Sequence, residues 1–337
     1  MAGPYVSSSD KNYVGFGKQS AKGSAAAPTV FAPYMGAVNL DHGMAAEEVR
    51  EGGIGPYVSR HVKTKHDPNG GCGFAWRPST GGKIAAYFLG ADAISGAGVP
   101  YSHAATPTET VVYVSVEQNL ADEFVERFVD AAISGLSISG EGGGDLMAAL
   151  TWLAMTPAWQ ASAATETYET GISGSTPGGP YRQNEATYTI DGGGATDVQS
   201  WKLDLAWKMD EDIRLSAVTR SYIVKLELTG KITLKQLLLA ATTYRTVNYG
   251  SASGTAADRN FNAGSFVAAY DNGLATTNQR TLNITAPNIN WLVDKYTPLN
   301  PDGETAWNER EGTLKKVAGT PFVTITSGTA DAAGYLA

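Results

Sequence analysis

Residues that bind metals or act as nucleophiles are scarce in this sequence. Its 337 residues include one cysteine, Cys72, and four histidines. A lone cysteine excludes an intrachain disulfide and makes a cytoplasm the simpler place of assembly. No apolar run approaches the length that crosses a bilayer, and residues 1–5 lack the basic start and apolar core of a secretion signal. We therefore expect a protein without disulfides, without a signal peptide and without a membrane partner.

Positive charge is also limited. Lys and Arg number 25 against 33 Asp and Glu, which gives a formal net charge of −8 at pH 7. Proteins that hold nucleic acid tightly neutralise its phosphates with clustered Lys and Arg. Because the sequence lacks such a cluster, we expect no tight binding to DNA, although an acidic chain is compatible with a conduit that DNA passes through.

Catalytic motifs are missing as well. There is no Gly-x-Ser-x-Gly, Cys72 lies between glycines, and no Gly-Lys pair has the upstream glycine of a phosphate-binding loop. His61, His66 and Asp67 offer metal ligands within seven residues, but positions 61 and 66 of one strand face opposite sides, and two nearby lysines add positive charge. We therefore expect no enzyme activity, no catalytic residue, no metal site and no cofactor.

What the sequence does contain favours a β-rich fold with many turns. It has 39 glycines and abundant Thr, Ser, Ala and Val, while long helical blocks of Leu, Glu and Lys are scarce. The patterns predict strands that begin at 37 and 57 and strands over 109–116, 133–139, 146–154, 198–207, 222–234, 265–270, 280–284, 289–293 and 322–326. They predict short helices over 83–89, 120–129 and 234–244, and a linker or long surface loop over 161–180.

The order of these elements is similar on the two sides of the 161–180 segment. Each half has a strand, an acidic excursion (44–56 or 209–212), a second strand and then a short helix. The residue identities barely repeat, so this is a repeat of pattern and not of sequence. A chance coincidence in a β-rich chain is the alternative interpretation.

The opening of the chain carries the most specific motif. Three glycines, a proline and many small residues favour an extended arm over a helix or a central strand. Gly17-Lys18-Gln19, followed by Gly23-Ser24-Ala25-Ala26-Ala27-Pro28-Thr29, resembles the N-terminal segment of tail tube proteins from long-tailed, non-contractile (siphovirus-like) bacteriophages. The layout of the whole chain resembles the two-domain version of that family.

This resemblance implies a mainly β fold of two tandem β-sandwich tube domains, each with a short flanking α-helix, that assemble into a β-barrel ring. The expected divisions are an extended arm over 1–30, a first tube domain over 31–160, a linker over 161–180 and a second tube domain over 181–337. The implied function is that of a structural virion protein, assembled in the host cytoplasm, that polymerises into stacked rings as the major tail tube. The implied partners are the chain itself, the tape measure protein, and the tail terminator and distal tail proteins, with DNA passing through at ejection. Three chains per ring with pseudo-sixfold symmetry is the preferred arrangement, and six chains is the competitor.

Two groups of residues are candidates for assembly contacts. The paired carboxylates could act in acid–base chemistry if they were buried, but solvated loop tips are the better interpretation. In the tail tube family such hairpins contact the adjacent ring beside an acidic lumen, so we expect some of them at the channel or at the seam between rings: Glu47, Glu48, Glu51, Asp210, Glu211 and Asp212. The expected arm contributes further candidates, ordered only against a neighbouring subunit: Lys18, Gln19, Pro28 and Phe31.

An alternative from another class is a carbohydrate-binding or adhesin-like β-sandwich. Its sugar platform would use the tryptophans of the second half, Trp201, Trp207, Trp291 and Trp307. Tryptophan at alternating strand positions is more often core or subunit interface, which we favour here. A hydrolase on a β scaffold would need a convergent catalytic set, and the sequence shows none.

Overall fold

The computed structural model describes residues 12–35, 38–49, 60–120, 124–172, 174–212, 219–237, 241–249, 251, 253–255, 263–296 and 307–337. Within these ranges the chain is mainly β, as the composition predicts. Neither of the α-helices in the described ranges is long and apolar enough to span a bilayer.

In the described residues of the first half there are twelve strands and one helix. They are β1 (Tyr13–Lys18), β2 (Val30–Ala32), β3 (Asn39–Asp41), β4 (Met44–Val49), β5 (Arg60–His66), β6 (Asn69–Ala75), α1 (Pro78–Leu89), β7 (Gly90–Ser95), β8 (Tyr101–Pro107), β9 (Val114–Leu120), β10 (Phe124–Glu141), β11 (Met147–Leu153) and β12 (Thr156–Trp159).

The second half opens with a 3₁₀ turn at Gln183–Glu185. It continues with β13 (Ala186–Ile190), β14 (Gly193–Ala195), β15 (Val198–Asp212), β16 (Tyr222–Leu237), α2 (Ala241–Tyr249), β17 (Ala263–Asp271), β18 (Thr281–Tyr296), β19 (Trp307–Leu314) and β20 (Thr324–Thr329).

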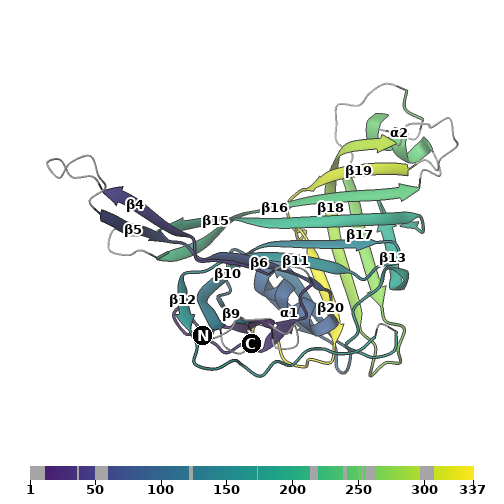
Figure 1. Cartoon of the computed structure of the whole chain (residues 1–337). Helices are drawn as coiled ribbons and strands as arrows, with labels where there is room; N and C mark the ends of the chain where they lie inside the picture. Colours follow the sequence, from purple (N-terminus) through teal and green to yellow (C-terminus); the bar gives the residue numbers. More distant parts are fainter. Residues whose placement is uncertain are drawn as a thin grey trace, which may run out of the picture.

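One large antiparallel sheet runs through both halves. Its order is β3-β6-β11-β10-β15-β16-β19-β18, so each half contributes four neighbouring strands. The halves join where β10 pairs with β15, from Gly135↔Ala206 to Glu141↔Ser200. Figure 1 follows this sheet from β6 and β11 up to β16 and β19.

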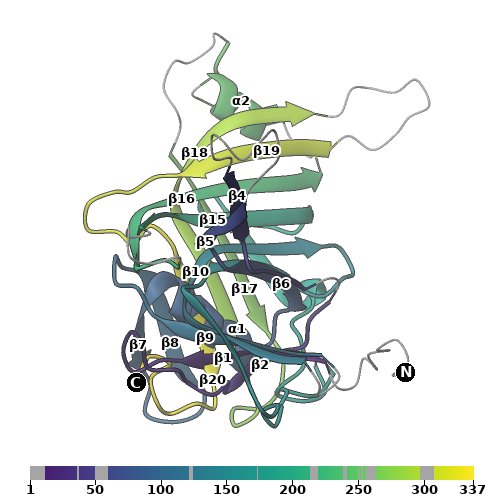
Figure 2. The ribbon, with the colours of Figure 1, turned by 60° about the vertical axis from the view of Figure 1, so that its left-hand side comes forward.

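Two smaller sheets share the long strands of the large one. The first has the order β2-β1-β9-β10-β12, and the second has the order β14-β13-β17-β18-β20, which β8 and β7 then extend. The early part of β10 lies in the first smaller sheet, and the early part of β18 lies in the second. The later parts of both strands lie in the large sheet. Strand pairing therefore follows the same order in both halves, with the β7–β8 hairpin as an addition in the first. The turned view of Figure 2 shows β1, β9 and β20 lying below the large sheet.

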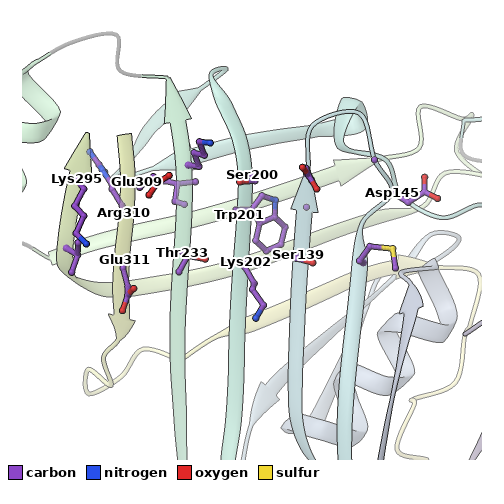
Figure 3. Close-up of a pocket in the computed structure, with 17 residues that line it drawn as sticks. Ser139, Asp145, Ser200, Trp201, Lys202, Thr233, Lys295, Glu309, Arg310 and Glu311 are labelled. Atoms are coloured by element: carbon purple, nitrogen blue, oxygen red, sulfur yellow. The ribbon is translucent and has the colours of Figure 1, made fainter. Parts of the chain in front are cut away.

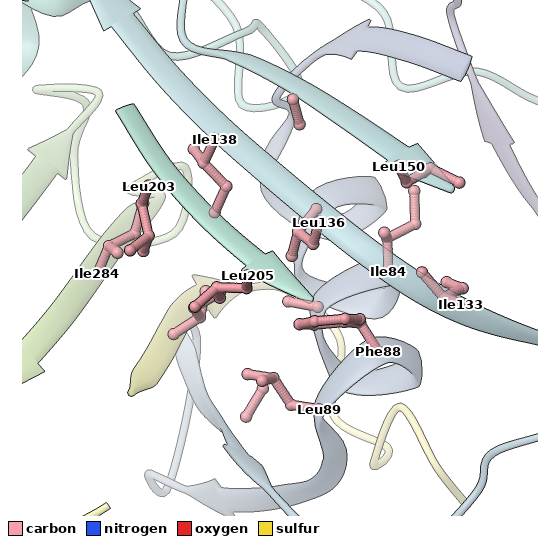
Figure 4. Packing of buried hydrophobic residues seen from close by; sticks show 14 of the residues in the cluster. Ile84, Phe88, Leu89, Ile133, Leu136, Ile138, Leu150, Leu203, Leu205 and Ile284 are labelled. Carbon is pink, nitrogen blue, oxygen red and sulfur yellow. The ribbon is translucent and has the colours of Figure 1, made fainter. Parts of the chain in front are cut away.

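Helix α1 fills the space between these sheets. All its residues except Ser79 and Lys83 are buried. Figure 4 shows Ile84, Phe88 and Leu89 among Leu136 and Ile138 of β10 and Leu203 and Leu205 of β15, so the helix packs beneath the joint between the two halves. The helix ends at Gly90, whose φ of 100° is left-handed and favours glycine.

The described residues of the 161–180 segment form no helix or strand, and they are packed against the first half. The Glu169 carboxylate accepts hydrogen bonds from the backbone N–H groups of Ser79 (3.0 Å) and Thr80 (2.7 Å) at the start of α1. This replaces the cap that Arg77 does not supply. Earlier in the segment, the Ala164 N–H donates to the Tyr13 hydroxyl at 2.6 Å. The segment thus ties the helix and β1 to the connection between the halves.

Three expectations about secondary structure were wrong. The helix over 120–129 is instead the start of β10 from Phe124 onward; residues 121–123 lie outside the described ranges. The strand is irregular between Phe128 and Ala131, where Asp130 has a φ of 55°, and successive residues from Phe128 to Ile133 are all buried, which an alternating strand pattern does not predict. Residues 234–237 belong to β16, and the helix described beyond them, α2, covers Ala241–Tyr249.

The third concerns the arm expected over 1–30, of which residues 1–11 lie outside the described ranges. From Tyr13 to Lys18 the chain is a buried strand that pairs with β9 on one side and β2 on the other. Val14 and Phe16 lie in the core at 0% exposure. Tyr13–Lys18 and Val30–Ala32 are therefore strands of this chain's own first sheet.

Candidate assembly and channel surfaces

The large sheet has one face whose side chains are exposed or half-buried along most of its width. On the strands of the first half this face carries small neutral residues: Gly135, Ser137, Ser139, Ala149 and Thr151. On the strands of the second half it carries charged and polar residues: Lys202, Asp204, Lys208, Lys231, Thr233, Lys235, Glu309 and Glu311. Figure 3 shows part of this second group on neighbouring strands. Strand alternation puts the buried residues, such as Trp201 and Leu203, on the other face.

The charges on this face are of both signs and partly paired. Lys202 Nζ lies 2.8 Å from Asp204 Oδ1 on the same strand, and Lys231 Nζ lies 2.7 Å from Glu311 Oε1 on the neighbouring strand. These pairs are exposed, so they add little to stability. They lower the positive electrostatic potential of the surface, because a lysine beside a carboxylate attracts a passing phosphate less than a lysine alone.

Two hairpins extend beyond the body of the molecule. Figure 1 shows β4–β5 and the outer ends of β15 and β16 projecting on the same side. Glu47 and Glu48 are exposed on β4, and Asp210 and Glu211 are exposed on β15. The backbone of Asp212 pairs with Tyr222, and Glu51 lies outside the described residues. The acidic candidates that are described thus lie on hairpin strands and not in the turns that the sequence suggested.

Arg220 connects the base of the first hairpin with the outer end of the second. Its guanidinium is 2% exposed and forms ion pairs with Asp67 from the first hairpin and Glu211 from the second. It also donates to the carbonyl oxygens of Pro68 (2.6 Å) and Ala154 (2.8 Å). Nothing in the sequence singled out this arginine, because its partners come from three separate segments.

A pair of histidines lies at the base of the first hairpin. His42 Nδ1 is 3.0 Å from His66 Nε2, and His42 Nε2 is 3.0 Å from Glu126 Oε2 on β10. The partner of His66 is therefore His42 and not His61, which is exposed. No group of three or more His, Cys, Asp or Glu side chains that could hold a metal ion occurs within the described part of the chain.

Lys225 is buried at the joint between the two halves. Its Nζ donates to the Phe88 carbonyl oxygen at 2.7 Å, near the end of α1, and lies 4.8 Å from the centroid of the Trp207 ring. Trp207 Nε1 donates to the same carbonyl at 3.0 Å. Burial lowers the pKa of Lys225 to about 7, because the charged ammonium loses its hydration. Its contacts with a helix end and an aromatic face compensate part of that loss.

The residues expected in an intersubunit arm have different environments. Phe31 and Pro28 are buried, and Gln19 is buried with its amide beside Ser115 and Asp130. Lys18 Nζ donates to the Ala337 carbonyl oxygen at 3.2 Å, at the surface. The first three side chains are therefore used inside this chain, and contact between Lys18 and a neighbour stays a prediction.

The residues weighed for other functions lie in the core. Cys72 is buried, and burial raises the pKa of its thiol to about 12, so it is a poor nucleophile. Three of the four tryptophans considered for a sugar platform are buried, with Trp201 at 2%, Trp207 at 7% and Trp291 at 4% exposure. They pack the inside of the second half, as we favoured.

The large sheet has open edges at both ends in the described structure. β3 pairs there only with β6, and β18 beyond Asn290 pairs only with β19. Such edges present backbone donors and acceptors that can pair with another chain. The structure thus combines an uncovered sheet face, two projecting hairpins and two open edges.

These features agree with the comparisons with known proteins. A model of a family described as phage tail tube protein matches residues 9–286. No curated protein matches the chain significantly. The matched range covers most of the chain, from the residues just before β1 to the middle of β18. The chain therefore belongs to the phage tail tube protein family and is a structural component of the virion tail.

Proposed function

We propose that this chain forms rings of three subunits with pseudo-sixfold symmetry, and that stacked rings build the tail tube. The observation that carries the proposal is the repeated pairing order of the large sheet. The first half contributes β3-β6-β11-β10, and the second contributes β15-β16-β19-β18 in the same relative order. We interpret the two halves as tandem tube domains, of which two make one chain and six make one ring.

The joint inside the chain suggests the joint between chains. Inside the chain, β10, the end strand of the four that the first half gives to the large sheet, pairs antiparallel with β15, the end strand of the four from the second half. We call each set of four strands, with the smaller sheet attached to it, one unit. Between chains, the corresponding strands are β18 of one copy and β3 of the next, and both have an open edge in the described structure. Every neighbouring pair in the sheet is antiparallel, so strand directions continue to alternate across this new joint. A closed ring would remove both open edges, which favours closure.

In the ring, the uncovered face of the large sheet would line the channel. Its small neutral side chains leave few groups for DNA to bind, and its lysines lie among carboxylates. DNA binds by exchanging counterions for Lys and Arg, so paired lysines keep that interaction weak. We propose that DNA and the tape measure protein occupy this channel in turn, and that the tail terminator and distal tail proteins bind the tube ends.

The projecting hairpins would contact the adjacent ring. Both extend on the same side of the sheet, and Arg220 joins the base of the first to the outer end of the second. Their exposed acids Glu47, Glu48 and Asp210 are then available at the seam between rings or beside the channel. Glu211 is already paired with Arg220, so its part in the seam is to orient the second hairpin.

Electron microscopy of the purified protein over a concentration series tests this proposal. We expect rings or hollow tubes with a stain-filled centre. The mass of single rings, measured by native mass spectrometry, separates the two arrangements: three subunits give three times 35.3 kDa, and six give twice that mass. Compact monomers at every concentration, including in the presence of isolated tail tips as nuclei, would overturn the proposal.

A further inference from the structure

We propose that an apolar surface formed by Leu120, Phe124 and Trp159 is covered by a second copy of this chain. This inference rests on the proposed ring and adds a specific contact to it. We call these three residues the β12 patch, because Trp159 ends strand β12, while Leu120 ends β9 and Phe124 begins β10.

The β12 patch is exposed in the single chain. Trp159 is 62% exposed, Phe124 is 39% exposed and Leu120 is 36% exposed. The rings of Phe124 and Trp159 meet edge to face with centroids 5.8 Å apart, and Leu120 is the pairing partner of Phe124. Contiguous exposed aromatic and aliphatic side chains of this kind mark interaction sites, and tryptophan is enriched at the energetic centres of interfaces.

The repeated pairing order shows what covers the matching surface in the second half. β12 follows β11 and pairs with the early part of β10, just as β20 follows β19 and pairs with the early part of β18. The far side of β20 pairs with β8 of the first half, from Ile325↔Ala105 to Thr329↔Tyr101. Within the described residues, nothing pairs with the far side of β12. One unit thus covers the outer strand of the next unit inside the chain, while β12 is left without that cover.

The same relation identifies the occupant. The unit that covers β20 is the one whose last strand, β10, pairs with the first strand of the unit it covers. Applied to the joint between chains, the copy whose β18 pairs with β3 is also the copy that would lie beside β12. The described part of its second half has no counterpart of β8, so we expect it to cover β12 with side chains and not with a paired strand. A second copy of this chain therefore fits the β12 patch better than an unrelated partner does.

The β12 patch is also close to the proposed joint. Glu126, which pairs with Trp159 across β10 and β12, contacts His42 at 3.0 Å, and His42 directly follows β3. One neighbouring subunit can therefore contact the β3 edge and the β12 patch together. β12 itself is short and contains Pro157, which limits backbone pairing, so we expect side-chain contacts to dominate.

Thiol labelling tests the contact, because the only native cysteine is buried and unreactive. In the variant Trp159→Cys, the rate of maleimide labelling is compared between monomers and assembled tubes. Ile172→Cys is the matched control, since Ile172 is 63% exposed and lies in the segment between the halves. We expect labelling at position 159 to slow by about tenfold or more in tubes, and labelling at position 172 to change by less than about twofold. If Trp159→Cys blocks assembly, Leu120→Cys is used in its place, and a folded Trp159→Cys monomer that cannot assemble itself supports the contact.

The remaining outcomes separate the alternatives. Tubes in which position 159 labels as fast as in the monomer overturn this inference and leave the proposed ring intact. Protection in whole tails but not in tubes of the pure chain assigns the patch to a different tail protein and also overturns it. Protection already in the monomer, relieved by removing residues 1–11, assigns the patch to the chain's own N-terminus. A wild-type protein that never assembles overturns the ring and this inference together.

Discussion

Replacing Arg220 with Met should destabilise the protein by about 3 kcal/mol, because removing one partner of a buried ion pair leaves the other partner without compensation. Arg220 is 2% exposed, and its main partner Asp67 is 16% exposed, so water replaces the guanidinium poorly at Oδ1, although Lys65 still pairs with Oδ2 of the same carboxylate. The Ala154 carbonyl oxygen also loses its 2.8 Å hydrogen bond. Glu211 is 35% exposed and can be hydrated again, which keeps the loss toward the lower end of the usual range.

The free energy of unfolding, measured by urea denaturation of the wild type and the variant, checks this magnitude. Arg182→Met is the matched control, since Arg182 forms a 3.4 Å pair with Asp145 in which both side chains are at least one-third exposed. The control should lose less than about 1 kcal/mol. Hydrogen exchange should also quicken in β5 and in the outer end of β15. Adding Asp67→Asn to Arg220→Met should restore part of the loss, because it removes the stranded charge. A loss below about 1 kcal/mol for Arg220→Met would show that the buried network does not hold the hairpins.

Three further predictions follow from other contacts. The pKa of Lys225 is lowered to about 7 in the folded chain, whereas the same side chain has a pKa near 10 in the unfolded chain. Between these two pH values the unfolded chain therefore binds more protons than the folded chain. Stability should therefore rise with pH from 7 to 9, by at most about 1.4 kcal/mol per pH unit, and Lys225→Met should remove this slope in denaturation curves at several pH values. An unchanged slope would show that the ammonium is not penalised by burial. Glu169→Ala should cost about 1–2 kcal/mol by uncapping α1, whereas an equally stable variant would mean that water replaces the carboxylate. Replacement of the hairpin acids Glu47, Glu48, Asp210 and Asp212 with Lys should impair tube assembly or DNA ejection, whereas the same replacement of the exposed Glu109 should not. Wild-type assembly and infectivity of the hairpin variant would refute the role of these acids.

The sequence predicts the strand-rich layout well where hydrophobic alternation is regular. The alternation over 198–207 and 222–234 lies within the long hairpin β15–β16, and the helix predicted over 83–89 is the end of α1. The first turns of α1 escaped prediction because they contain Gly81 and Gly82, which are poor helix formers. The structure explains Gly81: a Cβ there would lie 2.3 Å from the Trp76 indole, so the close approach of that ring requires glycine.

The candidate surfaces were harder to predict, because they depend on contacts between distant segments. The acidic hairpins follow from local sequence, although Glu47 and Asp210 lie on strands and not in turns. The strand at Tyr13–Lys18 was missed because its glycines hide the alternation, and its partner β9 lies about a hundred residues away. Arg220, Lys225 and Trp159 carry no local signal at all. Each is recognised only when the strands that surround it are in place.

Joining two tube units in one chain changes the energetics of the proposed ring. Three of its six joints are then made inside single chains, where β10 pairs with β15 and where Trp207 and Lys225 contact the end of α1. These joints cost no translational or rotational freedom when the ring forms. Only the joints between β18 and β3 must form by association, and each must offset that cost from its own contacts. The exposed Trp159 lies where such a joint needs added apolar burial. Because covalent linkage makes the β10–β15 contact effectively intramolecular, we expect substitutions there to lower the stability of the monomer, whereas substitutions at the β12 patch lower the extent of assembly.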